Sequence, residues 1–352
     1  MSQAPSIAGA CLLYAADMNR LYAGALLLAL TACAPRLQGV DPGTPPDPGQ
    51  WDPQPAPVEW WYVSAYLPEE QLAFHWAFFK YYAPEGYRVL GLPARTVFPY
   101  PFASEHLAVT DLRSDRFEFT ERHDFPELRA EVRADPLYLD LDGWRFQRTP
   151  EGFRLQAGSV DVALTPTKPP VVHPPGWSGT AETGRMYYVS YTRAELRGTV
   201  LGREVRGTAW IDHQWGEQMS GVAALWDWYG VHLSNGDDLM LYRIRDREGK
   251  VKVLHATRVD AAGGVTRLEG MRMGPLAYWT SPVTGLRYAV AWRVEGEGWR
   301  LEILPKRLEQ EIRGSGLPVA YWEGPVEGSG TWFGEDVRVW GVGEFVGGRY
   351  RR

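Results

Sequence analysis

Asp212 and His213 stand side by side in the segment RGTAWIDHQWG, between Trp210 and Trp215. An aspartate and a histidine supply the groups needed for acid–base catalysis, and the same pair can instead fix a strand end through hydrogen bonds. Consecutive residues of a β-strand point to opposite faces, so both side chains reach one cavity only if the strand is broken there. The pair therefore favours a structural role, with ligand contact and catalysis as the alternatives.

A second carboxyl group, Asp227, lies between Trp226 and Trp228 in the segment WDWYG. A carboxyl group buried among aromatic rings keeps its proton near neutral pH, and a tryptophan face stabilises a cation formed beside it. On a strand, however, Asp227 faces away from the two tryptophans. The simpler interpretation is a solvated side chain or a salt bridge with an arginine such as Arg243 or Arg245.

Aromatic residues supply a different kind of candidate site, because 16 Trp, 18 Tyr and 12 Phe make up 13% of the chain. Such side chains usually fill a core, and an apolar ligand pocket is the alternative. The candidates for ligand contact are Trp61, Trp76, Trp226, Trp228 and His232. His75 and His106 have no ligand partner at short spacing, so we expect them to be structural and expect no metal or other cofactor.

Composition and motifs exclude several classes of function. The formal net charge is −6, with both signs interspersed and no basic patch, so nucleic acid is not an expected partner. Cys11 and Cys33 both precede the predicted folded region, which excludes a disulfide framework and a cysteine-ligated zinc site. The sequence contains no Gly-x-Ser-x-Gly elbow, P-loop or His-Glu-x-x-His motif.

The elements that would position these residues are strands. In EWWYVSAYL, which begins at Glu59, bulky side chains occupy both faces of a period-two pattern, and LAFHWAFFKYY continues it after the turn PEEQ. We expect both faces of this hairpin to be buried, one of them lining a cavity. No apolar stripe of helical period extends beyond about two turns, which argues against large helices.

The second half of the chain repeats this pattern. LWDWYGVHLSNGDDLMLY predicts two strands joined at Asn235-Gly236, and it resembles the first hairpin when one residue of offset is allowed. Short strands separated by tight turns indicate barrels or sandwiches. We therefore predict an all-β protein with two related domains, residues 58–216 and 217–352.

The N-terminal region predicts export. Residues 21–32, LYAGALLLALTA, form an apolar run after Arg20 that fits a signal-peptide core and is too short to span a bilayer. The run ends in LTAC, which resembles a lipobox whose cysteine, Cys33, receives a diacylglycerol. We predict a signal peptide over 1–32, with Met18 a candidate start, and an extracytoplasmic lipoprotein on the periplasmic side or cell surface. An N-terminal helix with an incidental cysteine is the alternative.

A proline-rich segment follows the predicted lipidation site. From Ala34 to Pro57, eight of 24 residues are proline. Such a composition is typical of an extended, semi-stiff spacer that packs no core. We predict a linker over residues 33–57 that holds the folded region away from a membrane.

Several phrases of the sequence, taken in order, indicate a family. They are EWWYVSAYL, FHWAFFK, HLAVTDL, GTAWIDHQWG, WDWYGVHLSNGDDLMLYRIRD, YWTSPVTGLRYAVAWRV and YWEGPV. Together they resemble the AttH and carotenoid 1,2-hydratase (hydroxyneurosporene synthase) family of lipocalin-like proteins, from about Glu59 to Gly347. The resemblance implies two lipocalin-like antiparallel β-barrel or sandwich domains packed together. For most bacterial members it implies an exported lipoprotein, often associated with ABC transporters.

A minority of this family are hydratases that add water across the isolated terminal double bond of an acyclic carotenoid. For these members the resemblance places a His-x-Trp unit on His213 and Trp215. Asp227 and Tyr229 are the nearest candidates for the acidic residue and the tyrosine of a following strand.

These observations lead to one main hypothesis and one alternative. The main hypothesis is a lipoprotein, anchored to a membrane at Cys33, that binds an apolar or amphipathic small molecule of the lipid or isoprenoid class. It includes an accessory role beside an ABC-transporter permease. The alternative is a hydratase of the carotenoid 1,2-hydratase type, which protonates an alkene and captures the cation with water.

Overall fold

The protein is described by a computed structural model that covers residues 37–82, 88–89, 91–93, 101–124, 127–217, 225–314 and 320–348. All regular structure within these residues is β-strand, which confirms the predicted all-β class. No helix among them has the length and hydrophobicity to cross a membrane. The predicted signal peptide and Cys33 lie outside the described residues.

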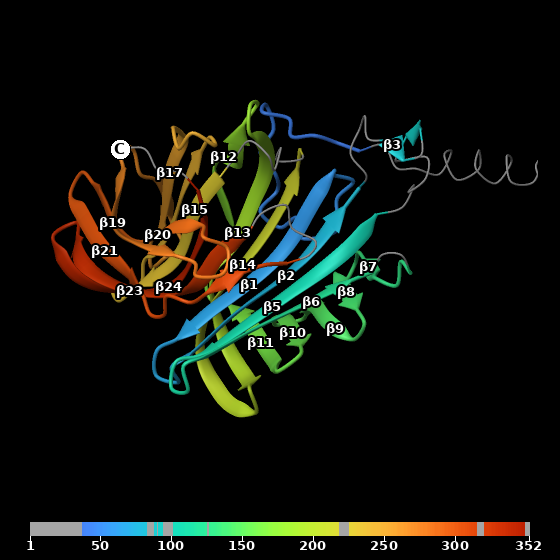
Figure 1. Ribbon diagram of the computed structural model, residues 1–352, viewed down its shortest axis with the longest axis horizontal. Helices are drawn as coiled ribbons and strands as arrows, with labels where there is room; N and C mark the ends of the chain where they lie inside the picture. The colour runs from blue at the N-terminus through green and yellow to red at the C-terminus, as the bar shows by residue number, and fades with distance from the viewer. Residues whose placement is uncertain are drawn as a thin grey trace, which may run out of the picture. The chain divides into compact units, whose positions relative to one another are not determined.

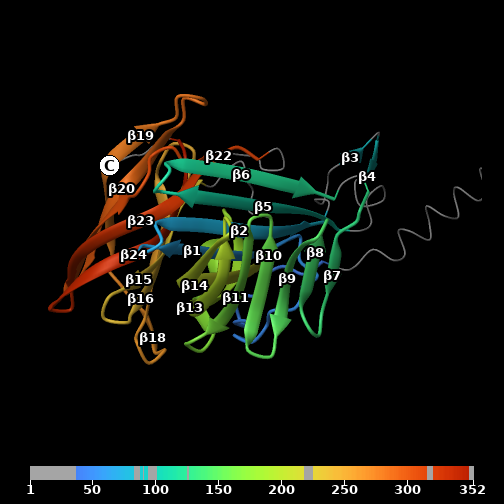
Figure 2. The same ribbon diagram turned by 90° about the horizontal axis from the view of Figure 1, so that it is seen from below.

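The first sheet contains twelve antiparallel strands. They are β1 (Val58–Leu67), β2 (Leu72–Tyr81), β5 (Phe102–Asp111), β6 (Arg116–His123), β7 (Glu131–Arg133), β8 (Tyr138–Leu141), β9 (Trp144–Thr149), β10 (Gly152–Ala157), β11 (Val160–Pro166), β12 (Val171–Thr180), β13 (Gly184–Val200) and β14 (Arg203–Gly216). Their order is β6-β5-β2-β1-β14-β13-β11-β10-β9-β8-β7, and β12 also pairs with β13. Figure 2 shows β8 to β11 running across the direction of β5 and β6, so the sheet is curled.

The second sheet contains ten antiparallel strands. They are β15 (Leu225–Leu233), β16 (Asp238–Arg245), β17 (Val251–Val259), β18 (Val265–Arg267), β19 (Arg272–Thr280), β20 (Arg287–Gly296), β21 (Trp299–Pro305), β22 (Glu311–Ile312), β23 (Tyr321–Trp332) and β24 (Glu335–Val346). Their order is β18-β17-β16-β15-β24-β23-β21-β20-β19, and β22 pairs with β23. Both sheets lie in one compact unit, residues 38–81 and 102–352 (Figure 1).

A second, small unit comprises residues 1–37 and 82–101. Its described strands are β3 (Arg88–Val89) and β4 (Leu92–Pro93), which pair with each other as a separate two-stranded sheet.

The two large sheets share one strand order. In each, the last strand returns beside the first, so β14 pairs with β1 and β24 pairs with β15. The predicted hairpins β1–β2 and β15–β16 are present at the centre of each sheet. Gly236 has a φ of 93° in the second turn, a conformation that glycine adopts without steric strain. The first sheet ends at Gly216 and the second begins at Leu225. Both sheets belong to one compact unit, so the division into two domains stays a prediction.

Each face of the first hairpin packs into a different core. Trp61 and Val63 belong to the cluster enclosed by the first sheet, whereas Tyr62 belongs to a cluster shared with Trp228 and Tyr242 of the second sheet. A further cluster fills the inside of the second sheet. The hairpin is therefore covered on both sides, as its bulky residues predict, because the second sheet covers the outer face of the first.

The proline-rich segment does not behave as the predicted spacer over residues 38–57, which we call the strap. Trp51 in the strap is 1% exposed and stacks on Tyr191 with ring centroids 4.9 Å apart. Trp61 Nε1 donates a hydrogen bond to the Trp51 carbonyl oxygen. Proline has no backbone N–H that needs a hydrogen-bond partner, so the strap can lie against the core. The Trp51 side chain enters that core, and the spacer prediction is therefore wrong for these residues.

Candidate functional site

A layer of polar and aromatic side chains lies between the two sheets, and we call it the seam. Its members come from β1, β2, β13 and β14 of the first sheet and from β15, β23 and β24 of the second. They are Tyr62, His75, Tyr188, Ser190, Trp210, Asp212, Trp226, Trp228, Glu323 and Glu344. Strand alternation places every second residue of these strands here. Trp226 and Glu344 are partly exposed, and the other members are buried.

Glu323 joins the two sheets inside the seam. Tyr62 Oη donates a hydrogen bond to Glu323 Oε1, and Glu323 Oε2 lies 3.3 Å from His75 Nε2. Burial raises the pKa of Glu323 well above its usual range, and the nearby Glu344 carboxyl raises it further. Burial also lowers the pKa of His75 to about 3. Near neutral pH the contact therefore joins a protonated carboxyl group to a neutral imidazole.

Glu344 is the direct neighbour of Glu323 in the β23–β24 register. Trp226 Nε1 donates a hydrogen bond to Glu344 Oε1. Removal from solvent raises the pKa of Glu344 to about 7, and Asp212 adds to the effect. Two carboxyl groups in one poorly solvated layer disfavour double ionisation, so at least one keeps its proton at neutral pH.

Asp212 is the third carboxyl group of the seam. It accepts hydrogen bonds from Ser190 Oγ, Trp210 Nε1 and Tyr188 Oη. Burial raises the pKa of Asp212 to about 7, although these three donors oppose the shift. Tyr188 Oη in turn accepts a hydrogen bond of 3.0 Å from Trp228 Nε1 of the second sheet. Asp212 is thus held on all sides by donors, which fits a positioning role better than proton transfer to a substrate.

Aromatic rings surround these carboxyl groups. Trp228 meets Tyr62 edge to face, with centroids 5.8 Å apart at 85°, and meets Trp210 at 6.1 Å and 82°. Tryptophan faces attract cations, and the low polarity of such a layer strengthens that attraction. The seam therefore combines carboxyl groups of raised pKa with tryptophan faces, the two features that protonation of an apolar substrate would need.

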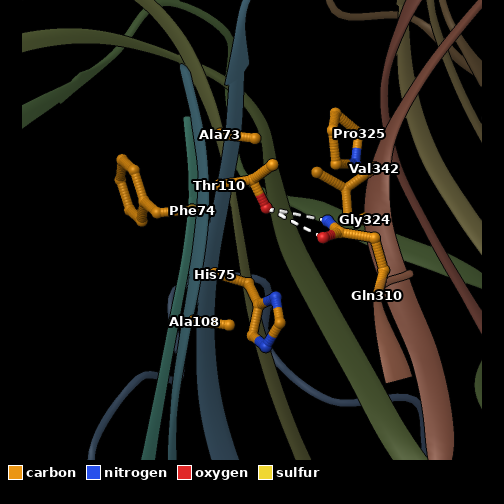
Figure 3. A pocket seen from close by; sticks show the side chains of 9 residues that line it. All are labelled: Ala73, Phe74, His75, Ala108, Thr110, Gln310, Gly324, Pro325 and Val342. Atoms are coloured by element: carbon orange, nitrogen blue, oxygen red, sulfur yellow. Dashed lines mark hydrogen bonds between the residues drawn. The ribbon is translucent and has the colours of Figure 1, made fainter. Parts of the chain in front are cut away.

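A small cavity opens beside His75 (Figure 3). The space inside it that a water-sized molecule can occupy is about 10 Å³, far below the range of about 300–1,000 Å³ for pockets that bind small organic ligands. The lining residues are Ala73, Phe74, His75, Ala108, Thr110, Gln310, Gly324, Pro325 and Val342. Figure 3 shows Thr110 and Gln310 joined by hydrogen bonds, while the Phe74 ring points away from them. Most of the lining is apolar, and its polar groups belong to His75, Thr110 and Gln310.

Comparison with known proteins identifies the family. Residues 45–347 match a family model described as AttH-like. The chain belongs to the AttH-like family. The match confirms the resemblance of the sequence phrases over nearly the whole folded region. None of the curated proteins is a significant match to the sequence.

Solved structures of similar proteins agree with this AttH-like fold. A putative AttH from Nitrosomonas europaea has 25% identity and a TM-score of 0.72, covering 88% of this chain and 99% of that chain. Kievitone hydratase from Nectria haematococca has 14% identity and a TM-score of 0.65, covering 89% and 96%. CghA with Sch210972 has 14% identity and a TM-score of 0.53, covering 90% and 99%. The last two likenesses show the fold alone, and the set confirms two lipocalin-like curled sheets.

In the AttH-like chain, His213 lies on the opposite face of β14 from Asp212, as strand geometry predicts. His213 Nε2 is 2.8 Å from Glu59 Oε1, and His213 Nδ1 is 3.0 Å from the Gln50 carbonyl oxygen of the strap. Trp61 and Trp215 stack on the imidazole with centroids 4.7 and 4.5 Å away. His213 and Trp215 therefore belong to the interior of the first sheet and not to the seam.

Asp227 and Tyr229 face the interior of the second sheet. Asp227 forms salt bridges with both Arg243 and Arg245, at 2.7 and 3.0 Å, and all three side chains are buried. The predicted arginine partners are thus present, whereas the solvated alternative is wrong. Tyr229 packs against Phe345 with ring centroids 5.1 Å apart. The structure does not bring the pair His213 and Trp215 together with the pair Asp227 and Tyr229.

The five predicted ligand contacts also separate into two places. Trp61 and Trp76 are fully buried in the core of the first sheet. Trp226 and Trp228 lie in the seam, and His232 packs beside Trp210 with its Nδ1 2.7 Å from Asp238. No three His, Cys, Asp or Glu side chains of the described ranges converge as a metal-binding group.

Sequence reasoning missed Glu323, Glu344 and Tyr62 as site residues of this AttH-like chain. A usable signal was present, because Glu323 follows Tyr-Trp in YWEGPV and Glu344 precedes Phe345 in a glycine-rich strand. A carboxyl residue within an otherwise apolar or aromatic strand, with both faces covered, indicates a buried acid.

Proposed function

We propose that this AttH-like protein is a hydratase that adds water to an isolated carbon–carbon double bond of an apolar small molecule in the seam. The observation that carries the proposal is the placement of Glu323 opposite Glu344, in a poorly solvated layer beside Trp226 and Trp228. Protonation of an unactivated alkene needs an acid that stays protonated at neutral pH, and a buried carboxyl group meets that need.

Glu323 is the acid in this mechanism. Its proton passes to the less substituted alkene carbon, and a tertiary cation forms on the other carbon. Tyr62 holds the carboxyl group in place through its hydrogen bond, and Glu344 disfavours early loss of the proton. Trp226 and Trp228 supply the faces that stabilise the cation. Water then captures the cation.

Binding of the substrate rests on burial of its apolar surface, at about 25 cal/mol per Å². The cavity beside His75, with room for about 10 Å³, is far smaller than an isoprenoid chain requires. Substrate entry therefore displaces aromatic side chains, and the partly exposed end at Trp226 and Glu344 is the proposed entrance. The shared fold of kievitone hydratase at 14% identity is consistent with this chemistry but does not carry it.

The test uses purified protein with an acyclic carotene and with shorter molecules bearing one trisubstituted double bond. We expect a mass gain of one water molecule and quenching of tryptophan fluorescence. Glu323→Gln should lower the hydration rate by about 10²–10⁴-fold while leaving quenching intact. Glu151→Gln, an exposed carboxyl change, is the matched control. Quenching without any water addition would instead identify a binding protein, and the absence of both would reject the proposal.

We also propose that the chain is an exported lipoprotein anchored at Cys33. The support is the order of Arg20, the apolar run and LTAC in the sequence. Metabolic labelling with a fatty acid in a bacterial host should mark the native chain, and Cys33→Ser should abolish the label and release the protein from membranes. An unlabelled native chain would contradict the anchor, and genes for an ABC permease and ATPase beside this gene would favour the transporter role.

A further inference from the structure

We propose that His75, at the edge of the seam cavity, binds the water that reacts and returns its proton to Glu323. This inference rests on the proposed hydratase function and assigns the second half of that reaction. The juxtaposition of an imidazole nitrogen, a carboxyl group and a small cavity with polar groups on part of its wall carries it.

The first observation is the position of His75. It lies at the centre of the first sheet on β2, paired with Ser64 on β1 and Ala108 on β5, and it is 4% exposed. Its Nε2 atom has no hydrogen-bond partner, although Glu323 Oε2 is only 3.3 Å away. A buried nitrogen left without a hydrogen bond is uncommon and requires an explanation such as a bound water.

The second observation is the cavity that His75 faces. Its polar lining comes from His75 and from the Thr110–Gln310 pair, in which Gln310 Nε2 donates to Thr110 Oγ1 over 2.7 Å. A buried water needs two to four polar partners and a space of its own size. The space that a water molecule can occupy here is about 10 Å³, which is the room of a single water, and polar groups of His75, Thr110 and Gln310 lie on its wall. The organic substrate does not fit in it.

The third observation is that the backbone of β23 fixes the position of the cavity relative to the Glu323 carboxyl group. Gly324 directly follows Glu323, and a Cβ atom there would lie 2.5 Å from Gln310 Nε2 and 2.8 Å from Gln310 Cγ. Only glycine therefore allows the Gln310 amide to approach β23 this closely. The dipeptide Glu323-Gly324 thus positions both the acid and the Gln310 amide that lines the proposed water site.

The reaction balances with these groups alone. Glu323 gives its proton to the alkene, whose π electrons form the new C–H bond and leave a tertiary cation and a carboxylate. A lone pair of the water at His75 forms the C–O bond. The extra proton on that oxygen passes to His75 Nε2 and from there to the Glu323 carboxylate. Water has then been added across the double bond, and both side chains have returned to their first state.

The decisive variant is His75→Phe, which keeps the ring volume and removes the nitrogen. In deuterated water the native protein should give the alcohol with one deuterium on carbon. His75→Phe should lower alcohol formation by at least about a hundredfold. It should still exchange deuterium into the recovered alkene, because the cation forms and loses a proton again. Hydration by His75→Phe at nearly the native rate would overturn the assignment.

Two controls separate this result from other failures. Glu323→Gln should lose both alcohol formation and deuterium exchange, and the exposed change Glu151→Gln should keep both at the native rate. A native protein without either reaction would reject the hydratase function itself.

The water site also has a test that needs no turnover. A crystal structure of the native protein should show an ordered water within hydrogen-bond distance of His75 Nε2, and the structure of His75→Phe should lack it. If His75→Phe does not fold, His75→Asn replaces it in these tests. Its crystal structure should retain the water, and its hydration rate should be reduced. An empty native cavity would overturn the inference whatever the activity.

Discussion

Glu323 and Glu344 are direct neighbours in the β23–β24 register, and the Glu344 carboxyl group disfavours ionisation of Glu323 in the seam. This relationship has a consequence for stability. A carboxyl group whose pKa is higher in the folded protein than in the unfolded chain binds more protons when folded. Its effect on stability is therefore absent at low pH and becomes unfavourable as the pH rises through the unfolded value.

Glu344→Gln should remove that penalty. The pKa of Glu344 rises from 4.5 to about 7 in the folded protein, so the variant and the native protein should be equally stable at low pH. Above about pH 7 the variant should be more stable by roughly 1–3 kcal/mol, and Gln still accepts the Trp226 hydrogen bond. Urea unfolding at about pH 4 and about pH 8 measures this difference. A stability difference independent of pH would contradict it, and Glu151→Gln controls for net charge.

Asp227→Asn should destabilise the protein by about 3–5 kcal/mol, because it leaves Arg243 and Arg245 buried without their carboxylate. The matched control is Asp161→Asn, which removes a carboxylate from the exposed salt bridge with Arg154. That change should have an effect of about 1 kcal/mol or less. Denaturant unfolding of both variants checks the prediction, and equal effects would show that the buried cluster has no special role in folding.

Trp51→Ala should release the strap. The side chain fills a site between Tyr191 and Phe153, and loss of a buried tryptophan costs about 3–5 kcal/mol. Limited proteolysis should then cut the chain within residues 38–57 much faster than in the native protein. His213→Ala should act in the same direction, because His213 Nδ1 bonds the Gln50 carbonyl oxygen.

Gln50→Ala is the control for the strap, since its backbone carbonyl remains available to His213. Unchanged proteolysis of Trp51→Ala and His213→Ala would mean that other contacts hold the strap.

Glu105→Met should stabilise the protein above neutral pH. Glu105 on β5 is fully buried and pairs in register with Phe78. Burial raises the pKa of Glu105 well above its usual range. The folded state therefore becomes less favourable as the pH rises through the unfolded value, and removing the carboxyl group should gain about 1–3 kcal/mol at about pH 8. Thermal unfolding across pH measures the gain, and a loss of stability at every pH would refute it.

Local patterns in the sequence were sufficient for much of the fold. Period-two alternation predicts the β1–β2 and β15–β16 hairpins, and the Asn235-Gly236 turn is where it was expected. Alternation also predicts that Asp212 and His213 separate. These features depend on neighbours in the chain, which is why one sequence reveals them.

The seam could not be predicted in the same way. The Tyr62–Glu323 hydrogen bond joins residues 261 positions apart, and it depends on how two curled sheets pack. Strand patterns fix the face on which a residue lies but not the partner across a second layer. The strap was mispredicted for a related reason, because composition describes the prolines and not the single tryptophan that holds the segment down.

The docked strap also limits how far the folded region can stand from a lipid anchor. The Gln38 backbone N–H donates to the Pro55 carbonyl oxygen within the strap, and the Asp41 backbone N–H donates to Tyr187 Oη of β13 in the first sheet. Four residues lie between Cys33 and Gln38, and the five residue-to-residue steps of a fully extended chain span only about 17 Å. An anchor at Cys33 would thus hold the protein within reach of the lipid headgroups, where an apolar substrate could pass from bilayer to protein with little exposure to water.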